Sequence, residues 1–245
     1  MRVAVRSNTG RVREVNEDCA FAESESGLAI LADGMGGHQA GDVASNLAVQ
    51  TLASCILEAL GESKAGQEDK SIDSILSRSI DQANRTVFVR ASEDNHLRGM
   101  GTTIVVALAD GDQVHIAHVG DSRAYLLRDG ELRQITRDHS LVQEMVTSGK
   151  ISEKEAGVHP MRYVLTRALG NNSEVVADIQ SLRWQHRDCL LLCSDGLTTM
   201  VKDRKIGKIL GRCRGDLESA CDELIRAANS GGGKDNITVV LACPA

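Results

Sequence analysis

Two short apolar runs, each ending in an aspartate followed by glycine, constrain the fold of this chain more than any other feature. They are LAILADG (28–34) and LLLCSDG (190–196). Their length and apolar character predict buried strands. A carboxylate in such a place is costly to bury unless it is paired or bound to a cation. Glycine allows a close approach of backbone to ligand, so these strand ends predict a site for a phosphate, a nucleotide or a metal.

The rest of the chain predicts helices in pairs and strands in hairpins. Helices are predicted over 42–60, which is apolar almost all round, and over 71–92, which has one polar face. Asp110-Gly111 and Asp129-Gly130 each join two strand-like runs, which is typical of β-hairpins. Further strands are predicted at 2–7 and 235–243, and a further helix near 215–229.

Residues 139–170 interrupt the strand pattern. The segment HSLVQEMVTSG (139–149) predicts a helix, and Ser152 with Glu155 forms a capping box for a second, short helix. The chain has only two prolines and no Pro-, Gly- or Ser-rich linker, which predicts a single domain over 1–245. Because strands and helices do not alternate, we expect an α+β fold with largely antiparallel sheet in layers.

Composition narrows the classes of protein further. Hydrophobic residues make up 42% of the 245, enough for a large core. The net charge of −6 argues against a nucleic-acid-binding protein, which needs a basic face for phosphates. Seven cysteines, an odd number without a C-x-x-C pair, predict reduced thiols in the cytosol. The sequence shows no apolar leader and no run approaching about 18 apolar residues, so we expect a soluble cytoplasmic protein without membrane contact.

Five aspartates lie beside predicted strands and not on helix faces: Asp18, Asp33, Asp121, Asp195 and Asp235. Oxygen ligands without cysteine pairs favour Mg²⁺ or Mn²⁺ over zinc. Two such ions close together can share a hydroxide and stabilise an in-line attack on phosphorus. A single Asp-Gly is more often a turn, so the combination carries the prediction.

Eight motifs run in order along nearly the whole chain: RVREVNED (11–18), LADGMGGH (31–38), MGTT (100–103), AHVGDSRAYLL (117–127), TRDHS (136–140), LTRALG (165–170), LLLCSDGLT (190–198) and GGGKDNITVV (231–240). Together they resemble the metal-dependent protein phosphatase family, the type 2C serine/threonine phosphatases, in its compact bacterial form. The resemblance implies a four-layer α-β-β-α sandwich with two largely antiparallel sheets. It also implies a flap subdomain at about 140–180, beside the site.

The resemblance implies a role for each carboxylate of the core site. Asp33 would bridge two Mn²⁺ or Mg²⁺ ions, with the Gly34 carbonyl on one of them. Asp195 and Asp235 would complete the coordination of the other ion. A hydroxide between the ions would then attack the phosphoserine or phosphothreonine phosphorus in line.

Further residues follow from the same resemblance. Glu17 and Asp18 would hold metal-bound waters, and Asp121 would hold a third, weaker ion. Arg13 matches the arginine that grips the substrate phosphate, which suits the bidentate geometry of a guanidinium. Two roles stay open for His38: general acid for the leaving oxygen, or a structural hydrogen bond to a metal-bound water or to the start of the next helix.

Three other classes of protein compete with this interpretation. A haloacid-type phosphatase would use Asp110 in DGDQV (110–114), but Asp110-Gly111 joins two strand-like runs, so a hairpin turn explains that string more simply. A nucleotide-binding module would use DGMGG (33–37), which lacks both the G-x-G-x-x-G spacing and a Walker lysine. A catalytically inactive relative would be expected to lack some of the ligands, and all of them are present.

The resemblance also implies partners. We expect phosphorylated proteins as substrates, a cognate serine/threonine kinase whose action is reversed, and a monomeric enzyme.

Overall fold

The structure is a computed structural model, and it describes residues 1–36, 40–64, 71–212 and 215–244. The first of its two sheets has the strand order β1 (Arg2–Asn8), β11 (Ile237–Cys243), β10 (Cys189–Cys193), β7 (Arg123–Arg128) and β8 (Glu131–Gln134). The second has the order β2 (Asp18–Glu23), β3 (Leu28–Met35), β5 (Ile104–Asp110), β6 (Gln113–Val119) and β9 (Asp178–Arg183), and β4 (Gly101–Thr102) pairs with β3.

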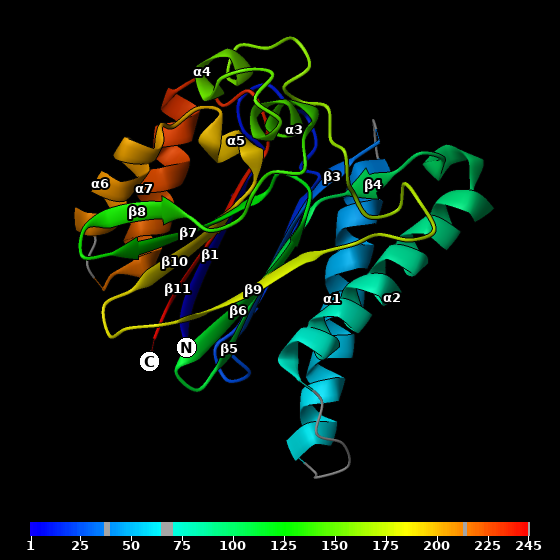
Figure 1. Cartoon of the computed structure of the whole chain (residues 1–245), viewed down its shortest axis with the longest axis horizontal. Coiled ribbons are helices and arrows are strands. Elements are labelled where there is room, and N and C mark those ends of the chain that lie inside the picture. Colours follow the sequence, from blue (N-terminus) through cyan, green and yellow to red (C-terminus); the bar gives the residue numbers. More distant parts are fainter. Residues whose placement is uncertain (37–39, 65–70, 213–214, 245) are drawn as a thin grey trace.

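Helices cover the outer face of each sheet. The helices α1 (Ala40–Lys64) and α2 (Ile72–Glu93) lie on the second sheet, and a short 3₁₀ turn, η1 (Asn95–Leu97), follows α2. The helices α6 (Asp203–Arg212) and α7 (Leu217–Ser230) lie on the first sheet. Three short helices, α3 (Leu141–Thr147), α4 (Glu153–Ala156) and α5 (Asp195–Thr198), gather at one end of the molecule (Figure 1).

Figure 1 shows the layers in the order helices, sheet, sheet, helices. All strand pairings among the described residues are antiparallel. The predicted α-β-β-α sandwich with antiparallel sheets is therefore confirmed.

The apolar strands owe their composition to their place between layers. In β3, Leu28 and Ile30 face the α1–α2 layer, and the alternate residues Ala29 and Leu31 face the other sheet. Successive strand side chains point to opposite faces, and both faces of this strand are covered. A strand in the middle of four layers must therefore be apolar at every position.

The helix α1 combines length with an apolar composition. Its segment Ala40–Gly61 has a mean hydropathy of 1.4, and among the described residues it alone meets the length and composition of a membrane-spanning helix. Ala44, Ala48, Leu52 and Ile56 recur at helical spacing and are fully buried against the second sheet and α2. This packing accounts for the apolar stripe, because a helix buried in a protein core can be as long and as apolar as one that spans a membrane.

Several local predictions are confirmed. Asp129 and Gly130 both adopt positive φ, 51° and 85°, in the turn between β7 and β8, as a two-residue hairpin turn requires. The turn after Asp110 joins β5 to β6. Ser152 and Glu155 form the predicted capping box at the start of α4.

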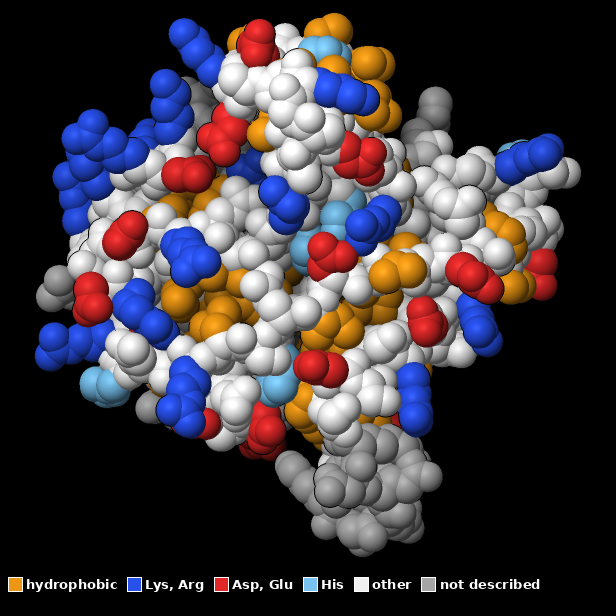
Figure 2. Space-filling view, viewed as in Figure 1, with side chains coloured by type: hydrophobic (Ala, Val, Ile, Leu, Met, Phe, Trp, Pro, Cys, Tyr) orange, Lys and Arg blue, Asp and Glu red, His pale blue; other side chains and the backbone are white. Residues whose placement is uncertain are grey.

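The sequence predicts none of six elements: β2, β4, β9, η1, α5 and α6. β9 is an edge strand whose side chains are mostly exposed, so it lacks an apolar run, and residues 178–180 of the predicted flap segment belong to it. In α6, Ile206, Ile209 and Leu210 give a helical apolar stripe that the sequence does contain. Figure 2 shows Lys and Arg side chains gathered over the solvent side of α6.

Candidate metal centre

Strand ends from both sheets meet at one open cavity of about 680 Å³. Seven of the predicted site residues line it: Arg13, Glu17, Asp33, Gly34, Asp121, Asp195 and Asp235. Asp18 is not part of the lining and is 8% exposed. His38 lies outside the described residues. The fold thus brings together residues that are up to about two hundred positions apart in the sequence.

The sheet topology explains this convergence. In the second sheet, Asp18 of β2 lies directly opposite Asp33 of β3. In the first sheet, Asp195 follows β10 and Asp235 precedes β11, and these two strands are antiparallel neighbours. Asp121 lies in the connection from β6 to β7, where the chain crosses from one sheet to the other.

The carboxylates repel one another in the absence of cations. Burial, followed by the charges of Asp18, Asp195 and other neighbours, raises the pKa of Asp33 well above its ordinary value. Burial and nearby Asp121 raise the pKa of Asp195 to about 8. Like-charged groups directly opposite on a sheet are destabilising, so such a cluster needs protons or cations.

Burial is also the main cause of two further shifts. It raises the pKa of Asp18 to about 6 and, with the charge of Asp138, that of Asp121 to about 6. Two buried oxygens, Glu17 Oε1 and Asp18 Oδ1, have no hydrogen-bond partner among the described residues. Unpaired buried oxygens next to clustered carboxylates fit hydrated divalent cations, which take oxygen ligands and keep several waters.

Hydroxyl groups hold the aspartates in place. Ser194 Oγ donates to Asp18 Oδ2 at 2.8 Å and accepts from the Thr238 amide at 3.0 Å. The Asp33 amide donates to Thr103 Oγ1 at 3.1 Å, and the Thr102 hydroxyl donates to the Asp33 carbonyl at 2.9 Å. Thr102 and Thr103 therefore position the backbone of Asp33 at the end of β3.

The segment between β1 and β2 carries Arg13 and Glu17, and Asn236 anchors it. Its Oδ1 accepts from the Glu17 amide at 2.8 Å, and its Nδ2 donates to the carbonyls of Thr9 and Val15 at 3.0 and 2.9 Å. The sequence analysis gave Asn236 no role. Asn236 directly follows the predicted ligand Asp235, which is the one feature of the sequence that could have pointed to it. Its hydrogen-bond partners are more than two hundred positions away in the sequence, so they are visible only in the fold.

Arg13 lies at the mouth of the cavity, with a half-exposed side chain. Its Nη2 donates to Asp235 Oδ2 at 2.9 Å. This hydrogen bond raises the pKa of the guanidinium, with Glu17 and Asp33 also contributing. The guanidinium is therefore a fixed positive charge beside the carboxylates, where an anionic group would arrive.

Glycine is required where backbones cross at the site. A Cβ on Gly34 would lie 2.1 Å from the Gly41 carbonyl oxygen and 2.7 Å from the Glu17 carbonyl oxygen. A Cβ on Gly196 would lie 1.9 Å from the Asn236 carbonyl oxygen. These separations are far below contact distance, so the glycine after each strand-end aspartate permits close packing of chain segments.

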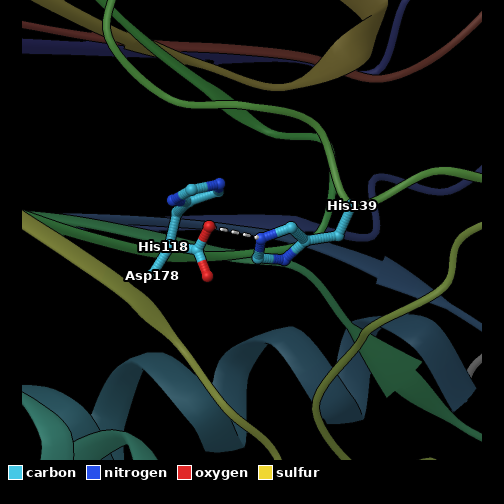
Figure 3. Close-up of side chains that lie close together, drawn as sticks. All are labelled: His118, His139 and Asp178. Carbon is cyan, nitrogen blue, oxygen red and sulfur yellow. Dashed lines mark ion pairs between the residues drawn. The ribbon is translucent and has the colours of Figure 1, made fainter. Parts of the chain in front are cut away.

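A second cluster, His118, His139 and Asp178, also has the composition of a metal site, and its ligand atoms lie within 4.8 Å of one another (Figure 3). Its geometry opposes this use. The two rings stack with centroids 4.5 Å apart and an interplanar angle of 23°, so their in-plane lone pairs do not converge on one ion.

The partners of this cluster are already in place. His139 Nδ1 accepts from the Gly120 amide at 3.2 Å, and its Nε2 lies 3.3 Å from Asp178 Oδ2 and 3.3 Å from Arg167 Nη1. Arg167 Nη1 lies 2.7 Å from Asp178 Oδ1 and supplies the cation. The cluster therefore joins the segment before α3 to β6 and β9 through its own hydrogen bonds and ion pairs.

Comparisons with known proteins agree with this geometry. Residues 10–242 match the family Protein phosphatase 2C. The chain is 43% identical over 244 residues to the serine/threonine phosphatase stp of Listeria welshimeri, which covers 98% of this chain and 95% of that protein.

Solved structures give the same result. The crystal structure of the serine/threonine phosphatase PstP/Ppp of Mycobacterium tuberculosis has a TM-score of 0.88 and 39% identity, with 99% of this chain and 97% of that chain covered. The catalytic domain of PstP in complex with two manganese ions has a TM-score of 0.85 and 38% identity, with the same coverage of each chain. The chain belongs to the protein phosphatase 2C family and is a metal-dependent protein serine/threonine phosphatase.

Proposed function

We propose that the aspartate cavity is the catalytic centre and that Asp33, Asp195 and Asp235 hold two core Mn²⁺ or Mg²⁺ ions, together with the Gly34 carbonyl. One observation carries this assignment: carboxylates from both sheets face one cavity, and repulsion and burial raise the pKa of Asp33 and Asp195. Divalent ions bound there would lower the pKa of water and neutralise phosphate charge.

Glu17 and Asp18 act behind the core ligands in this proposal. Glu17 Oε1 and Asp18 Oδ1 are buried acceptors without partners, so each can accept a hydrogen bond from the hydration shell of a cation. The Ser194 hydroxyl fixes the orientation of Asp18 by binding its other oxygen. Outer groups of this kind orient ligands and tune affinity.

Arg13 binds the phosphate of the substrate in the proposed mechanism. Its guanidinium is held at the mouth of the cavity by one hydrogen bond to Asp235. A planar fork of donors matches two oxygens of a phosphate monoester, which positions phosphorus over the carboxylates. For His38 the two alternatives, general acid or structural hydrogen bond, stand as in the sequence analysis.

Asp121 is proposed as the ligand of a third, weaker ion. It lines the same cavity, and the neighbouring charge of Asp138 adds to the effect of burial on its pKa. It lies apart from the core ligands in sequence, in the connection between the two sheets. A site with few protein ligands and several waters binds Mg²⁺ or Mn²⁺ weakly.

The wider setting is also a proposal. We infer that the enzyme is a cytoplasmic monomer of a bacterial signalling system and that it reverses a cognate serine/threonine kinase. Support comes from the names of its bacterial relatives, which are serine/threonine phosphatases. We also propose a single catalytic domain over 1–245, with a flap at about 140–180 beside the cavity. Tyr163 and Leu165 of this flap line the cavity.

The test is hydrolysis of a phosphothreonine peptide with Mn²⁺ and with EDTA. Asp33→Asn, Asp195→Asn and Asp235→Asn should each nearly abolish turnover, and Asp81→Asn, an exposed change in α2, should have no effect. Asp121→Asn should lower turnover at moderate Mn²⁺ and recover at high Mn²⁺. Full activity in EDTA, or in any of the three core variants, would exclude the assignment. Unchanged kinetics of Asp121→Asn at every metal concentration would return that residue to a structural role.

A further inference from the structure

Two cysteine thiols meet at the end of the first sheet that is remote from the metal centre. Leu190 of β10 lies opposite Ala242 of β11, so the next residues outward, Cys189 and Cys243, lie opposite each other. Opposed residues of antiparallel strands have Cα atoms about 4.5–5.5 Å apart, which falls inside the range of about 4.4–6.8 Å found in disulfides. The two cysteines are therefore placed at a backbone separation that is compatible with a disulfide.

Both thiols are reachable from solvent through a second cavity. This cavity has a volume of about 630 Å³ and lies between the sheet and the helices α6 and α7, and both cysteines line it. Arg2 of β1, which lies opposite Cys243 on its other side, also lines it. The cavity is large enough for water and small peroxides to reach the sulfur atoms.

The two thiols differ in acidity. The hydrogen bond from Cys189 and the positive charge of Arg2 lower the pKa of Cys243, although burial opposes them. The same hydrogen bond, together with burial, raises the pKa of Cys189 well above its ordinary value. Cys243 is thus the more acidic thiol and the better nucleophile of the two, and Cys189 is the adjacent thiol that can resolve its oxidation product.

We propose that Cys189 and Cys243 form a thiol modification site, at which a hydroperoxide oxidises Cys243 and Cys189 converts the product to an intramolecular disulfide. The Cys243 thiolate attacks the peroxide, the O–O bond breaks, and a sulfenic acid forms with release of water or an alcohol. Cys189 then attacks the Cys243 sulfur, the S–O bond breaks, and the hydroxide leaves as water with the Cys189 proton. The two sulfurs lose two electrons, and the peroxide gains them.

The Cys189–Cys243 pair lies far from the aspartate cavity. β10 leads from Cys189 to Asp195, and β11 leads from Asp235 to Cys243, so the thiols and the carboxylates occupy opposite ends of the same two strands. Figure 1 shows the carboxyl end of β11 near both chain termini, and α5, which begins at Asp195, at the other end of the molecule. Oxidation of this pair should leave the metal ligands untouched.

The experiment treats the full chain, loaded with Mn²⁺, with hydrogen peroxide. The expected result is the loss of two thiols, a linked Cys189–Cys243 peptide pair in mass spectrometry, and full reversal by dithiothreitol. Phosphatase activity should stay within about twofold, because the oxidised sulfurs lie away from the carboxylates. A disulfide that involves Cys221 or another chain, or thiols that persist at peroxide concentrations that oxidise free cysteine, would overturn the proposal.

Single variants assign the two roles. Cys189→Ser should accumulate sulfenic acid at Cys243, trapped as a dimedone adduct. Cys243→Ser should slow the oxidation of Cys189 by about tenfold or more, because the more acidic thiol is gone. Cys55→Ser, a half-buried cysteine in α1, is the matched control and should behave as the wild type. Equal labelling of Cys189 in the Cys243→Ser variant would refute the assigned roles.

Discussion

Replacing Asp195 by asparagine should stabilise the metal-free protein while removing a metal ligand. Burial and the neighbouring aspartates raise the pKa of this carboxyl to about 8. At about pH 7.5 the folded state therefore keeps a proton that the unfolded chain, with a pKa of about 3.9, has released. At ~1.4 kcal/mol per pH unit, this proton uptake costs the folded state ~5 kcal/mol.

Asparagine is nearly isosteric with aspartate and carries no charge, so it removes this cost. Because Asp121 and Asp235 also contribute to the repulsion, the substitution should remove only part of this cost to the folded state. We expect a gain in the free energy of unfolding of ~2–5 kcal/mol. For a chain of this size ~1 kcal/mol shifts the melting temperature by ~2–4 °C, so we expect a rise of at least ~4 °C. The assay is thermal melting in EDTA, with Asp81→Asn as the exposed control.

The same variant should respond less to metal. Ions that bind only the folded state stabilise the wild type in proportion to the logarithm of their concentration, and a lost ligand weakens that binding. Added Mn²⁺ should therefore raise the melting temperature of the wild type more than that of Asp195→Asn. If the variant melts below the wild type in EDTA, burial of this carboxylate does not dominate its energetics, and the reasoning fails.

Three further results are expected. The pKa values of Asp18, Asp121 and Asp195 are raised in the folded state, so the folded state binds more protons than the unfolded chain. The stability of the metal-free protein should therefore fall as pH rises from about 4 to about 8. Thermal melting in EDTA across this pH range checks the prediction, and a stability that rises with pH would contradict it. Arg13→Lys keeps the positive charge but loses the bidentate pair of guanidinium donors, so KM for a phosphopeptide should rise with little change in kcat. Arg13→Ala should raise KM further. Wild-type kinetics in both variants would place Arg13 outside the site. Ser194→Ala leaves Asp18 Oδ2 and the Thr238 amide without their hydrogen-bond partner. This should lower the free energy of unfolding by ~1–3 kcal/mol, measured by chemical denaturation with Mn²⁺ present. An unchanged midpoint would show that water replaces the hydroxyl.

Local patterns in the sequence were enough to predict the class of fold and most of the residues that line the aspartate cavity. Apolar runs such as LAILA and LLLC predict strands covered on both faces, because they are short and entirely apolar and end at glycine-containing turns. The glycines after Asp33 and Asp195 indicate close packing at the strand ends, and the motif order indicates the family. Each of these patterns involves residues that are neighbours in the chain, so they can be recognised from the sequence without a structure.

The polar groups that come together in space can be identified only from the folded structure. The pairing of Asp18 with Asp33, the anchoring of the Arg13 segment by Asn236 and the meeting of Cys189 with Cys243 all depend on strand register, which links distant residues. The edge strand β9 escaped prediction because its mostly exposed side chains need no apolar pattern. Register and burial arise from packing the layers together, and packing also sets the pKa values on which the chemistry depends.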